Sequence, residues 1–448
     1  MKLCIMNGLV LSPADGVNEG IEEICHLYIE DGIIKRIIKK GMEGNEPFHD
    51  GRVIDANGKW VVPGLIDLHV HFREPGQTHK EDIESGCRAA AKGGFTTVVC
   101  MPNTEPPLDS PRLIGFIDKK GRESCGINLL SAASITEGQK GNELVDIDAL
   151  ARLNTRCFEL SGRGIAAFTE DGKTVTNTRI MLEAMEIAKG FDIPIFSHAE
   201  DHHLSGGAMN QGETAKKLGI SEIPAEGEEI IVARDMLLSK NTGCRMHFCH
   251  ISTKTSVELI RLGKEMGLSI TAETAPHYFI LTEEDVEQPK GTGRADPNYK
   301  MNPPLRTRED REAIKRALED GTLDVIATDH APHHKDDKKK DFESAAFGIT
   351  GLEISFPLCF THLVNTGLLT PIQLIDKMSR TPADILNIPR GTIGEGRVAD
   401  LAIFDVDEEY EVDVNDFESK GRNTPFQRRR VFGKTLFTIV GGEIVYEG

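Results

Sequence analysis

The sequence predicts a mixed α/β fold: a (β/α)8 TIM barrel joined to a small β-sandwich domain that is built from both ends of the chain. Eight short apolar runs recur along the middle of the chain, separated by helical patterns or long loops, and this arrangement predicts the barrel. Polar side chains follow many of these runs, at the strand ends where barrel enzymes carry their chemistry. Short alternating apolar segments near both termini predict the sandwich.

The first elements are three strands near the amino terminus, where apolar segments are punctuated by glycine. They cover residues 2–6, 27–29 and 33–38. The eight barrel strands follow, and their continuous apolar character indicates burial on both faces, as in parallel sheets. They cover residues 64–71, 96–101, 127–132, 165–169, 193–198, 246–250, 269–273 and 324–329.

Three more alternating segments close the chain, at residues 401–404, 435–440 and 443–446. A barrel of this kind leaves roughly a quarter of the 448 residues for another unit. We therefore expect residues 1–54 and 390–448 to form one composite sandwich domain beside a barrel domain of residues 55–389.

The most informative stretch is Asp67-Leu68-His69-Val70-His71, directly after the apolar run 61–66. Alternate side chains of a strand share a face, so Asp67, His69 and His71 point the same way. Two imidazoles at this spacing can bind one divalent metal ion, although paired histidines also occur on solvated strand edges.

Other strand ends supply further donors of the kind that metals bind, and imidazole nitrogens dominate the set. The six candidate ligands are His69, His71, Asp171, His198, His250 and Asp329. This mixture suits zinc better than magnesium or calcium. Six ligands are too many for one tetrahedral ion with an open position, so two ions that share Asp171 as a bridge fit the count better. His277 reads equally well as a loop imidazole and is left out of the set.

Several motifs resemble the class I bacterial dihydroorotases of the cyclic amidohydrolase superfamily, and the resemblance runs through nearly the whole chain. The motifs are DLHVHFREPG at 67–76, MPNT at 101–104, FTEDG at 168–172, MNPPLR at 301–306, TDHAPH at 328–333 and NTPF at 423–426. Related enzymes that open dihydropyrimidine, hydantoin or allantoin rings usually have a carboxylated lysine at the bridging position. This chain has Asp171 there, as the class I dihydroorotases do.

The resemblance implies a role for each metal ligand. His69, His71 and Asp329 would bind the first ion, Asp171 would bridge, and His198 and His250 would hold the second. Two departures from the family pattern are small: Glu170 stands where a second aspartate is common, and Ala199 follows His198 where cysteine is frequent.

The resemblance also implies the substrate contacts. Arg73, Asn103 and His333 would grip the substrate carboxylate, and Asn302 would contact the ring amide. The backbone around Phe347 and Gly348 would help to close over the substrate. From the residues alone, the guanidinium fork of Arg73 matches a carboxylate, but an arginine at a barrel mouth is also commonly just solvated or ion-paired. Asn103 reads equally well as a turn residue after Pro102.

The expected reaction is the reversible cyclisation of N-carbamoyl-L-aspartate to L-dihydroorotate, a step of de novo pyrimidine biosynthesis. A ring amide resists water because its carbonyl is a weak electrophile and its nitrogen a poor leaving group. Two metal ions would polarise the carbonyl and lower the pKa of bridging water from about 15.7 toward 7. Asp329 would take the hydroxide proton and deliver it to the departing nitrogen.

Two alternatives remain open. One is another cyclic amidohydrolase, a dihydropyrimidinase, hydantoinase or allantoinase, against which the missing bridging lysine and the set Arg73, Asn103 and His333 argue. The other is a catalytically silent barrel that serves as a scaffold for aspartate carbamoyltransferase. Silent members of the family have lost metal-binding histidines, whereas this chain keeps all four.

Composition limits the partners. The chain has 52 Lys and Arg against 71 Asp and Glu, a net charge of −19, which argues against nucleic acid or an anionic membrane as a partner. No apolar run is long enough to span a membrane. The mixed-charge run 335–341 reads as a solvated loop, or with residues 283–300 as a mobile rim over the active site. Nine scattered cysteines indicate a reducing cytoplasm. We expect a homodimer that acts on small molecules and allow an association with aspartate carbamoyltransferase.

Overall fold

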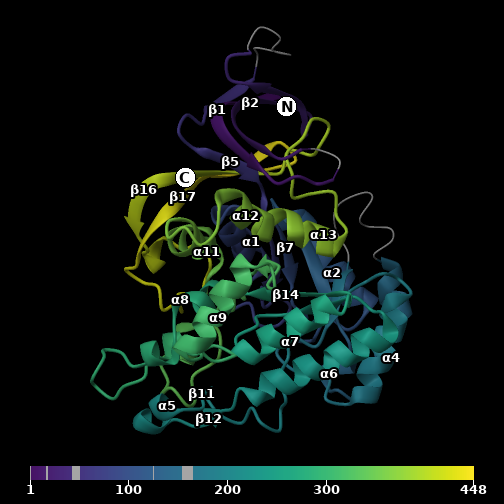
Figure 1. Ribbon diagram of the computed structural model, residues 1–448. Helices are drawn as coiled ribbons and strands as arrows, with labels where there is room; N and C mark the ends of the chain where they lie inside the picture. The colour runs from purple at the N-terminus through teal and green to yellow at the C-terminus, as the bar shows by residue number, and fades with distance from the viewer. Residues whose placement is uncertain (1, 17–18, 43–50, 125, 154–164) are drawn as a thin grey trace.

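The computed structural model describes residues 2–16, 19–42, 51–124, 126–153 and 165–448, and it contains the barrel and the terminal sheet that the sequence predicts (Figure 1). Eight parallel strands follow one another around the barrel in chain order. They are β6 (Leu65–Val70), β7 (Phe95–Cys100), β8 (Asn128–Ser134), β9 (Ile165–Thr169), β10 (Ile195–Ser197), β13 (Met246–Phe248), β14 (Ile270–Thr274) and β15 (Val325–Ile326). Each one overlaps a predicted strand, so the predicted fold class is confirmed.

The barrel closes between its last strand and its first. A parallel bridge pairs Val70 with His330, and the backbone N–H of His71 donates to His330 O at 2.9 Å. Below this bridge, Thr328 Oγ1 donates to Asp67 Oδ2 at 2.6 Å, in a fully buried position. Asp67 therefore joins the strand that carries His69 and His71 to the segment that carries Asp329.

The helices cover the outside of the barrel, with one apolar face turned inward. The longer ones are α1 (Ile83–Lys92), α2 (Pro111–Ser124), α4 (Thr178–Lys189), α6 (Glu226–Thr242), α7 (Lys254–Glu265) and α9 (Arg308–Glu319). In α9, for example, Ala313, Ile314, Ala317 and Leu318 are buried, a spacing that places them on one stripe. Thr307 begins this helix with a capping box, because its hydroxyl accepts from the backbone N–H of Asp310.

Shorter helices occupy the loops and the region after the last barrel strand. They are α5 (Glu213–Leu218), α8 (Pro276–Ile280), α10 (Lys335–Lys338), α11 (Ser355–Cys359), α12 (Pro371–Ile375) and α13 (Thr381–Leu386). A two-stranded ribbon, β11 (Met209–Asn210) and β12 (Glu222–Ile223), lies beside α5. In the described residues no helix is both long and apolar enough to cross a membrane.

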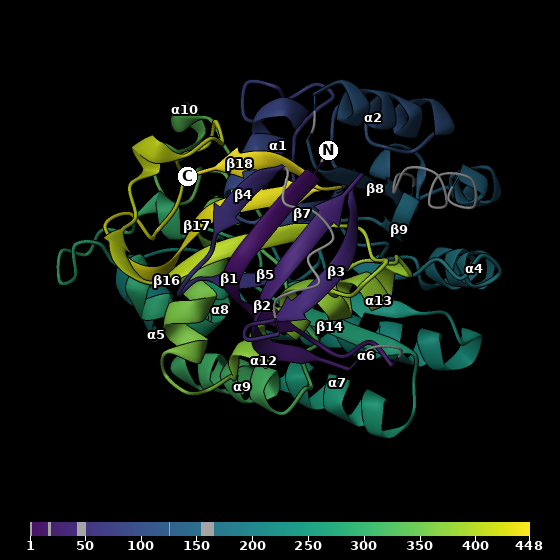
Figure 2. The ribbon, with the colours of Figure 1, turned by 90° about the horizontal axis from the view of Figure 1, so that it is seen from above.

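The second sheet combines strands from both ends of the chain (Figure 2). Its strands are β1 (Lys2–Ser12), β2 (Ile21–Glu30), β3 (Ile33–Lys39), β4 (Arg52–Asp55), β5 (Trp60–Pro63), β16 (Leu401–Glu411), β17 (Arg430–Val440) and β18 (Glu443–Glu447). Strand β5 joins the two halves, because it pairs with β1 on one side and β16 on the other. Residues of β1, β2, β5 and β16 share one apolar core.

Three details differ from the sequence-based prediction. Strand β5 was not predicted: the apolar run 61–66 is divided at Gly64, where the chain passes from the terminal sheet to the barrel and the Gly64 N–H donates to Asp400 O at 2.8 Å. The short strand β4, which pairs with β1, was not predicted. Cys87 takes part in a disulfide bond, which the scattered spacing did not predict.

Candidate metal centre and active site

Four of the six predicted metal ligands meet where strands β6, β9 and β15 end. His69 Nε2 lies 3.1 Å from Asp171 Oδ1. His71 Nε2 lies 3.2 Å from Asp329 Oδ1 and 3.5 Å from Asp171 Oδ2. Donor atoms of His69, His71 and Asp329 lie within 4.8 Å of one another, which is close enough for one ion to touch all three.

The remaining two ligands approach Asp171 from the other side, at the ends of β10 and β13. His198 Nδ1 lies 3.4 Å from Asp171 Oδ1 and 2.9 Å from His250 Nε2. His250 Nε2 is 3.7 Å from the same carboxylate oxygen. Asp171 thus faces both pairs of histidines, which is the position that a bridging carboxylate requires.

Several buried atoms of this centre have no hydrogen-bond partner in the described chain. They include His69 Nε2, Asp171 Oδ1 and His250 Nδ1. Burial would raise the pKa of Asp171, but the neighbouring histidines outweigh it and hold the pKa well below its usual range. An ionised Asp171 carboxylate that faces an unpartnered His69 nitrogen, with further imidazoles beside it, fits a bound cation.

Two carboxylates that the sequence analysis did not single out hold the histidines in place. Glu273 Oε1 accepts from His69 Nδ1 at 3.0 Å, and its other oxygen lies 3.1 Å from His247 Nε2. Burial alone would raise the pKa of Glu273, but hydrogen bonds from His247 and His69 lower it to about 2. Because Nδ1 of His69 carries the proton to Glu273, Nε2 keeps a free lone pair toward the centre.

Glu200 does the same for the second pair. Its Oε2 accepts from His198 Nε2 at 3.1 Å, so His198 turns Nδ1 toward Asp171. Its Oε1 accepts from Asn302 Nδ2 at 3.0 Å. The sequence offered one signal for Glu200, its position two residues after His198 beyond a strand end. Nothing in the pattern distinguished Glu273 from a buried strand residue.

Backbone strain gathers at this centre. Arg73, His250 and Asp329 have φ angles of 60°, 36° and 48°, in the left-handed region that favours glycine. Non-glycine residues hold such angles only where the surrounding structure compensates for them, and functional sites are where they concentrate.

A cavity of about 200 Å³ opens beside the centre, and all six predicted substrate-contact residues line it. They are Arg73, Asn103, Asn302, His333, Phe347 and Gly348. The cavity is also lined by five of the six candidate ligands, the exception being the deeper His69. The sequence-predicted ligands and substrate contacts therefore occupy one site. His277 is buried nearby but does not line the cavity, and burial lowers its pKa to about 4.

Arg73 is only 8% exposed and lies along the wall of this cavity. Its Nε donates to Pro332 O at 3.3 Å, and its Nη2 lies 3.4 Å from His333 Nε2. His333 Nε2 in turn donates to Phe347 O at 2.6 Å. Burial, followed by the charge of Arg73, lowers the pKa of His333 to about 2, so this imidazole is neutral.

Asn103 lies between the centre and the cavity. Its Oδ1 is 2.9 Å from His71 Nδ1, and its Nδ2 donates to Asp171 Oδ2 at 3.5 Å. This orientation makes His71 Nδ1 the donor and leaves His71 Nε2 free to face Asp329. Asn103 is therefore part of the site rather than only a turn residue.

Two further side chains, Glu170 and Cys249, lie beside the centre without joining its ligands. Glu170 Oε2 accepts from the backbone N–H groups of Ile135 and Thr136, both at 3.1 Å, so it holds the β8 loop and points away from the ligands. Cys249 groups with His69 and Glu273 and not with the other candidate ligands.

The sequence is similar to that of known dihydroorotases. Residues 58–256 match the family model described as dihydro-orotase-like. The dihydroorotase of Ruminiclostridium cellulolyticum is 44% identical over 99% of this chain and 98% of its own length. That of Bacillus caldolyticus is 46% identical over 94% of both chains.

The fold is also similar to solved structures of hydantoinases. The L-hydantoinase (dihydropyrimidinase) of Arthrobacter aurescens aligns with a TM-score of 0.84 at 25% identity, over 99% of this chain and 96% of that one. A D-hydantoinase structure aligns with a TM-score of 0.82 at 27% identity, over 100% of this chain and 95% of that one. The sequence similarity to dihydroorotases is much closer than that to these hydantoinases, and it extends over nearly the whole chain. The barrel, the terminal sheet and the histidine-rich centre agree with it. The chain belongs to the dihydroorotase family of cyclic amidohydrolases.

Proposed function

We propose that the chain catalyses the reversible cyclisation of N-carbamoyl-L-aspartate to L-dihydroorotate and water, in de novo pyrimidine biosynthesis. The observation that carries the proposal is the cavity, in which a buried arginine, an asparagine and a histidine stand beside the histidine-rich centre. A ring-opening site for dihydroorotate needs both features, because this substrate carries a carboxylate that other cyclic ureides lack. Relatives that bear the name dihydroorotase over nearly the full length of the chain support the same substrate.

We assign two zinc ions to the centre. One would be held by His69, His71 and Asp329, the other by His198 and His250, with Asp171 shared between them. The unpartnered buried atoms and the nitrogen-rich donor set support this assignment. When bound, such ions polarise the ring carbonyl and lower the pKa of water.

The protein's own groups would do the rest. Arg73 would bind the substrate carboxylate through its guanidinium fork, with Asn103 and His333 beside it. Asn302 would orient the ring amide, and the backbone at Phe347 and Gly348 would cover the substrate. These contacts would fix the scissile amide against the centre and so reduce the entropic cost of the reaction.

Asp329 would carry the proton. Its carboxylate lines the cavity, so it can accept a proton from the attacking water and donate it to the ring nitrogen as the amide bond breaks. In the reverse direction it would take the proton from the ureido nitrogen as that nitrogen attacks the carboxyl carbon, and would pass it to the carboxyl oxygen that leaves as water when the C–O bond breaks. The same residue thus serves hydrolysis and cyclisation.

A second candidate is a hydantoinase or dihydropyrimidinase activity, which the structural neighbours favour. Three observations weigh against it. No lysine is among the described residues that line the cavity, and Asp171 stands between the two histidine pairs. Arg73 also has no use in binding a substrate without a carboxylate.

A comparison of the turnover of five substrates separates these candidates. Zinc-loaded protein is offered N-carbamoyl-L-aspartate, L-dihydroorotate, dihydrouracil, hydantoin and allantoin, and product formation is followed by chromatography. We expect conversion of the first two and a kcat/KM for the others that is lower by at least about 100-fold, because the arginine contact is lost. Preferred turnover of dihydrouracil, hydantoin or allantoin would overturn the assignment, and a zinc-loaded protein that turns over none of the five would support the scaffold alternative.

We also propose how this unit is organised and where it acts. Residues 55–389 would form the catalytic domain, and residues 1–54 with 390–448 the composite sandwich domain. A homodimer in the cytoplasm, with an association with aspartate carbamoyltransferase, fits a pathway enzyme whose substrate is the product of that carbamoyl transfer. Gel filtration of the chain alone and mixed with that transferase tests both assemblies.

A further inference from the structure

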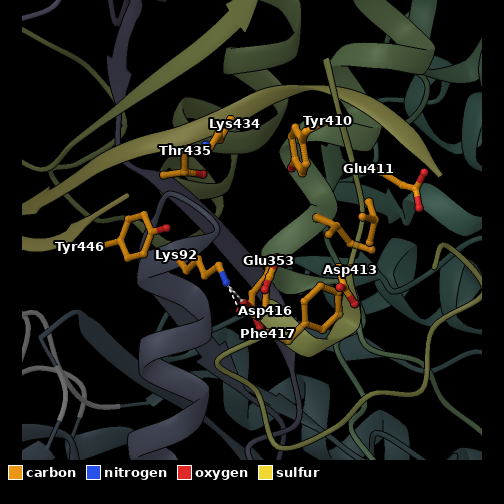
Figure 3. A pocket seen from close by; sticks show the side chains of 12 residues that line it. Lys92, Glu353, Tyr410, Glu411, Asp413, Asp416, Phe417, Lys434, Thr435 and Tyr446 are labelled. Atoms are coloured by element: carbon orange, nitrogen blue, oxygen red, sulfur yellow. Dashed lines mark hydrogen bonds and ion pairs between the residues drawn. The ribbon is translucent and has the colours of Figure 1, made fainter. Parts of the chain in front are cut away.

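Among the cavities of the described residues, two that lie outside the catalytic one differ in the charge of their linings. The first, of about 510 Å³, lies between α1, β16 and β17 (Figure 3). Its lining includes four carboxylates, those of Glu353, Glu411, Asp413 and Asp416. Lys92 Nζ forms an ion pair with Glu353 Oε2 at 3.3 Å. This mixed lining selects no class of ligand.

The second cavity, of about 430 Å³, is basic. We call it the basic vestibule and define it by its lining: Asn298, His333, His334, Lys335, Lys338, Lys339, Lys420, Arg422 and Asn423. Five of these residues are lysine or arginine, and none carries a carboxylate. Such a lining is unexpected in a protein with a net charge of −19, because randomly placed residues would bring acids into it.

The basic vestibule and the catalytic cavity share a wall. His333 lines both cavities and is only 7% exposed. Its backbone N–H donates to Asn423 Oδ1 at 3.0 Å, and Asn423 Nδ2 donates to Gly348 O at 3.0 Å. A ligand in the basic vestibule is therefore separated from the proposed substrate site by the His333 side chain and the loop that ends at Gly348.

Most of the positive charge in the basic vestibule is not neutralised. Lys420 pairs with Asp82, but Lys338 Nζ donates only to backbone carbonyls, those of Pro297, Lys300 and Ala346 at 2.7–3.0 Å. Arg422 likewise donates to the carbonyl groups of a neighbouring turn. Carbonyl groups satisfy the hydrogen bonds of Arg422 but leave its charge in place, whereas burial lowers the pKa of Lys338 to about 7, so Lys338 is only partly charged at neutral pH.

Lys335 and Lys339 are exposed, and across the described ranges neither lies within 4.0 Å of a carboxylate oxygen in an ion pair. The acids nearest in sequence are engaged elsewhere: Asp336 faces His334 at 3.3 Å, and Asp337 faces His333 Nδ1 at 4.0 Å. The sequence-based interpretation of 335–341 as a solvated loop is therefore wrong for Lys338, which is buried, and incomplete for the two exposed lysines.

We propose that the basic vestibule is an outer binding site for a small dianion, and that its occupant is the dicarboxylate substrate on its way to the catalytic cavity. The identity of the occupant rests on the proposed function. N-carbamoyl-L-aspartate carries two carboxylates, and an acidic protein repels it at long range. A cationic cavity beside the site reverses this repulsion locally, and such focusing can raise association rates by about 10-fold or more.

The test neutralises the two exposed lysines, which are not tied to the fold. The double variant Lys335→Gln/Lys339→Gln is compared with Lys35→Gln/Lys240→Gln, which removes the same charge at exposed positions outside the basic vestibule. In the zinc-loaded enzyme we expect the first variant to lower kcat/KM for N-carbamoyl-L-aspartate by about 5-fold at low salt. Its kcat should stay within about twofold, and the deficit should vanish at about 0.5 M salt. Equal kcat/KM in parent, variant and control at every salt concentration would overturn the proposal.

A second measurement does not depend on turnover. Succinate, an unreactive dicarboxylate, and inorganic phosphate are titrated into the zinc-loaded parent and both variants by calorimetry. We expect succinate affinity to fall in the Lys335→Gln/Lys339→Gln variant alone. A fall for phosphate but not for succinate would assign the site to phosphate-bearing ligands and overturn the substrate as occupant. A parent without any turnover would refute the proposed function, and the succinate titration would still decide whether the basic vestibule binds dicarboxylates.

Discussion

Arg73→Lys separates substrate binding from metal binding, because the variant keeps the positive charge and removes the planar fork. The guanidinium is buried and touches Pro332 O and His333 but none of the candidate ligands. Replacing a two-pronged charge-assisted contact by a single point contact should weaken substrate binding by about 1.5–3 kcal/mol. At about 1.4 kcal/mol per factor of ten, KM for L-dihydroorotate should rise by about 10- to 150-fold.

The assay is steady-state hydrolysis of L-dihydroorotate, with zinc content measured on the same preparation. Zinc content should equal that of the parent, since the ligand set is untouched. Arg88→Lys on α1 is the matched control, because Arg88 is half exposed and pairs with Glu84 on the surface. An unaltered KM in Arg73→Lys would refute the carboxylate contact at this position.

Three further predictions test the centre and its rim. Asp171→Ala should lose at least one zinc ion per chain and most turnover while the circular dichroism spectrum stays that of the parent; full zinc content at a normal rate would remove Asp171 from the centre. Glu273→Gln should weaken zinc affinity by about 10- to 100-fold in a chelator competition, because the residue orients His69; an unchanged affinity would contradict that role. Burial and the charge of Lys300 lower the pKa of Lys338 to about 7, below its value in the unfolded chain. Between about pH 7 and about pH 10 the unfolded state therefore binds more protons than the folded state, and the free energy of unfolding should rise with pH across this window. Lys338→Met should flatten this rise in urea unfolding curves, and an identical slope would show that Lys338 titrates normally.

The barrel could be predicted from the sequence because two independent sequence signals indicate its strands. Each is an apolar run buried on both faces, and several end in a polar residue, as with His198 after β10 and Asp329 after β15. The six candidate ligands could be predicted for the same reason. Parallel strand ends meet at one edge, so residues far apart in the chain arrive together.

Other features could not be predicted because they depend on contacts between distant segments. Glu273 lies inside β14, and its role becomes visible only when His69 and His247 are seen on either side. The split of the run 61–66 depends on Asp400, more than 300 residues later in the chain. Lys338 reads as a surface charge until Pro297, Lys300 and Ala346 surround it.

The most direct test of the proposed mechanism is one variant measured in both directions. Asp329→Asn keeps an oxygen that can face His71 and a similar volume, but it cannot carry a proton. With zinc occupancy determined on the same sample, we expect near-full occupancy and substrate binding, and a rate lower by about 100- to 10,000-fold for both hydrolysis of L-dihydroorotate and cyclisation of N-carbamoyl-L-aspartate. Near-normal turnover at full zinc occupancy would contradict the proton-carrying role, and lost zinc with activity restored by excess zinc would show instead that Asp329 only holds the metal.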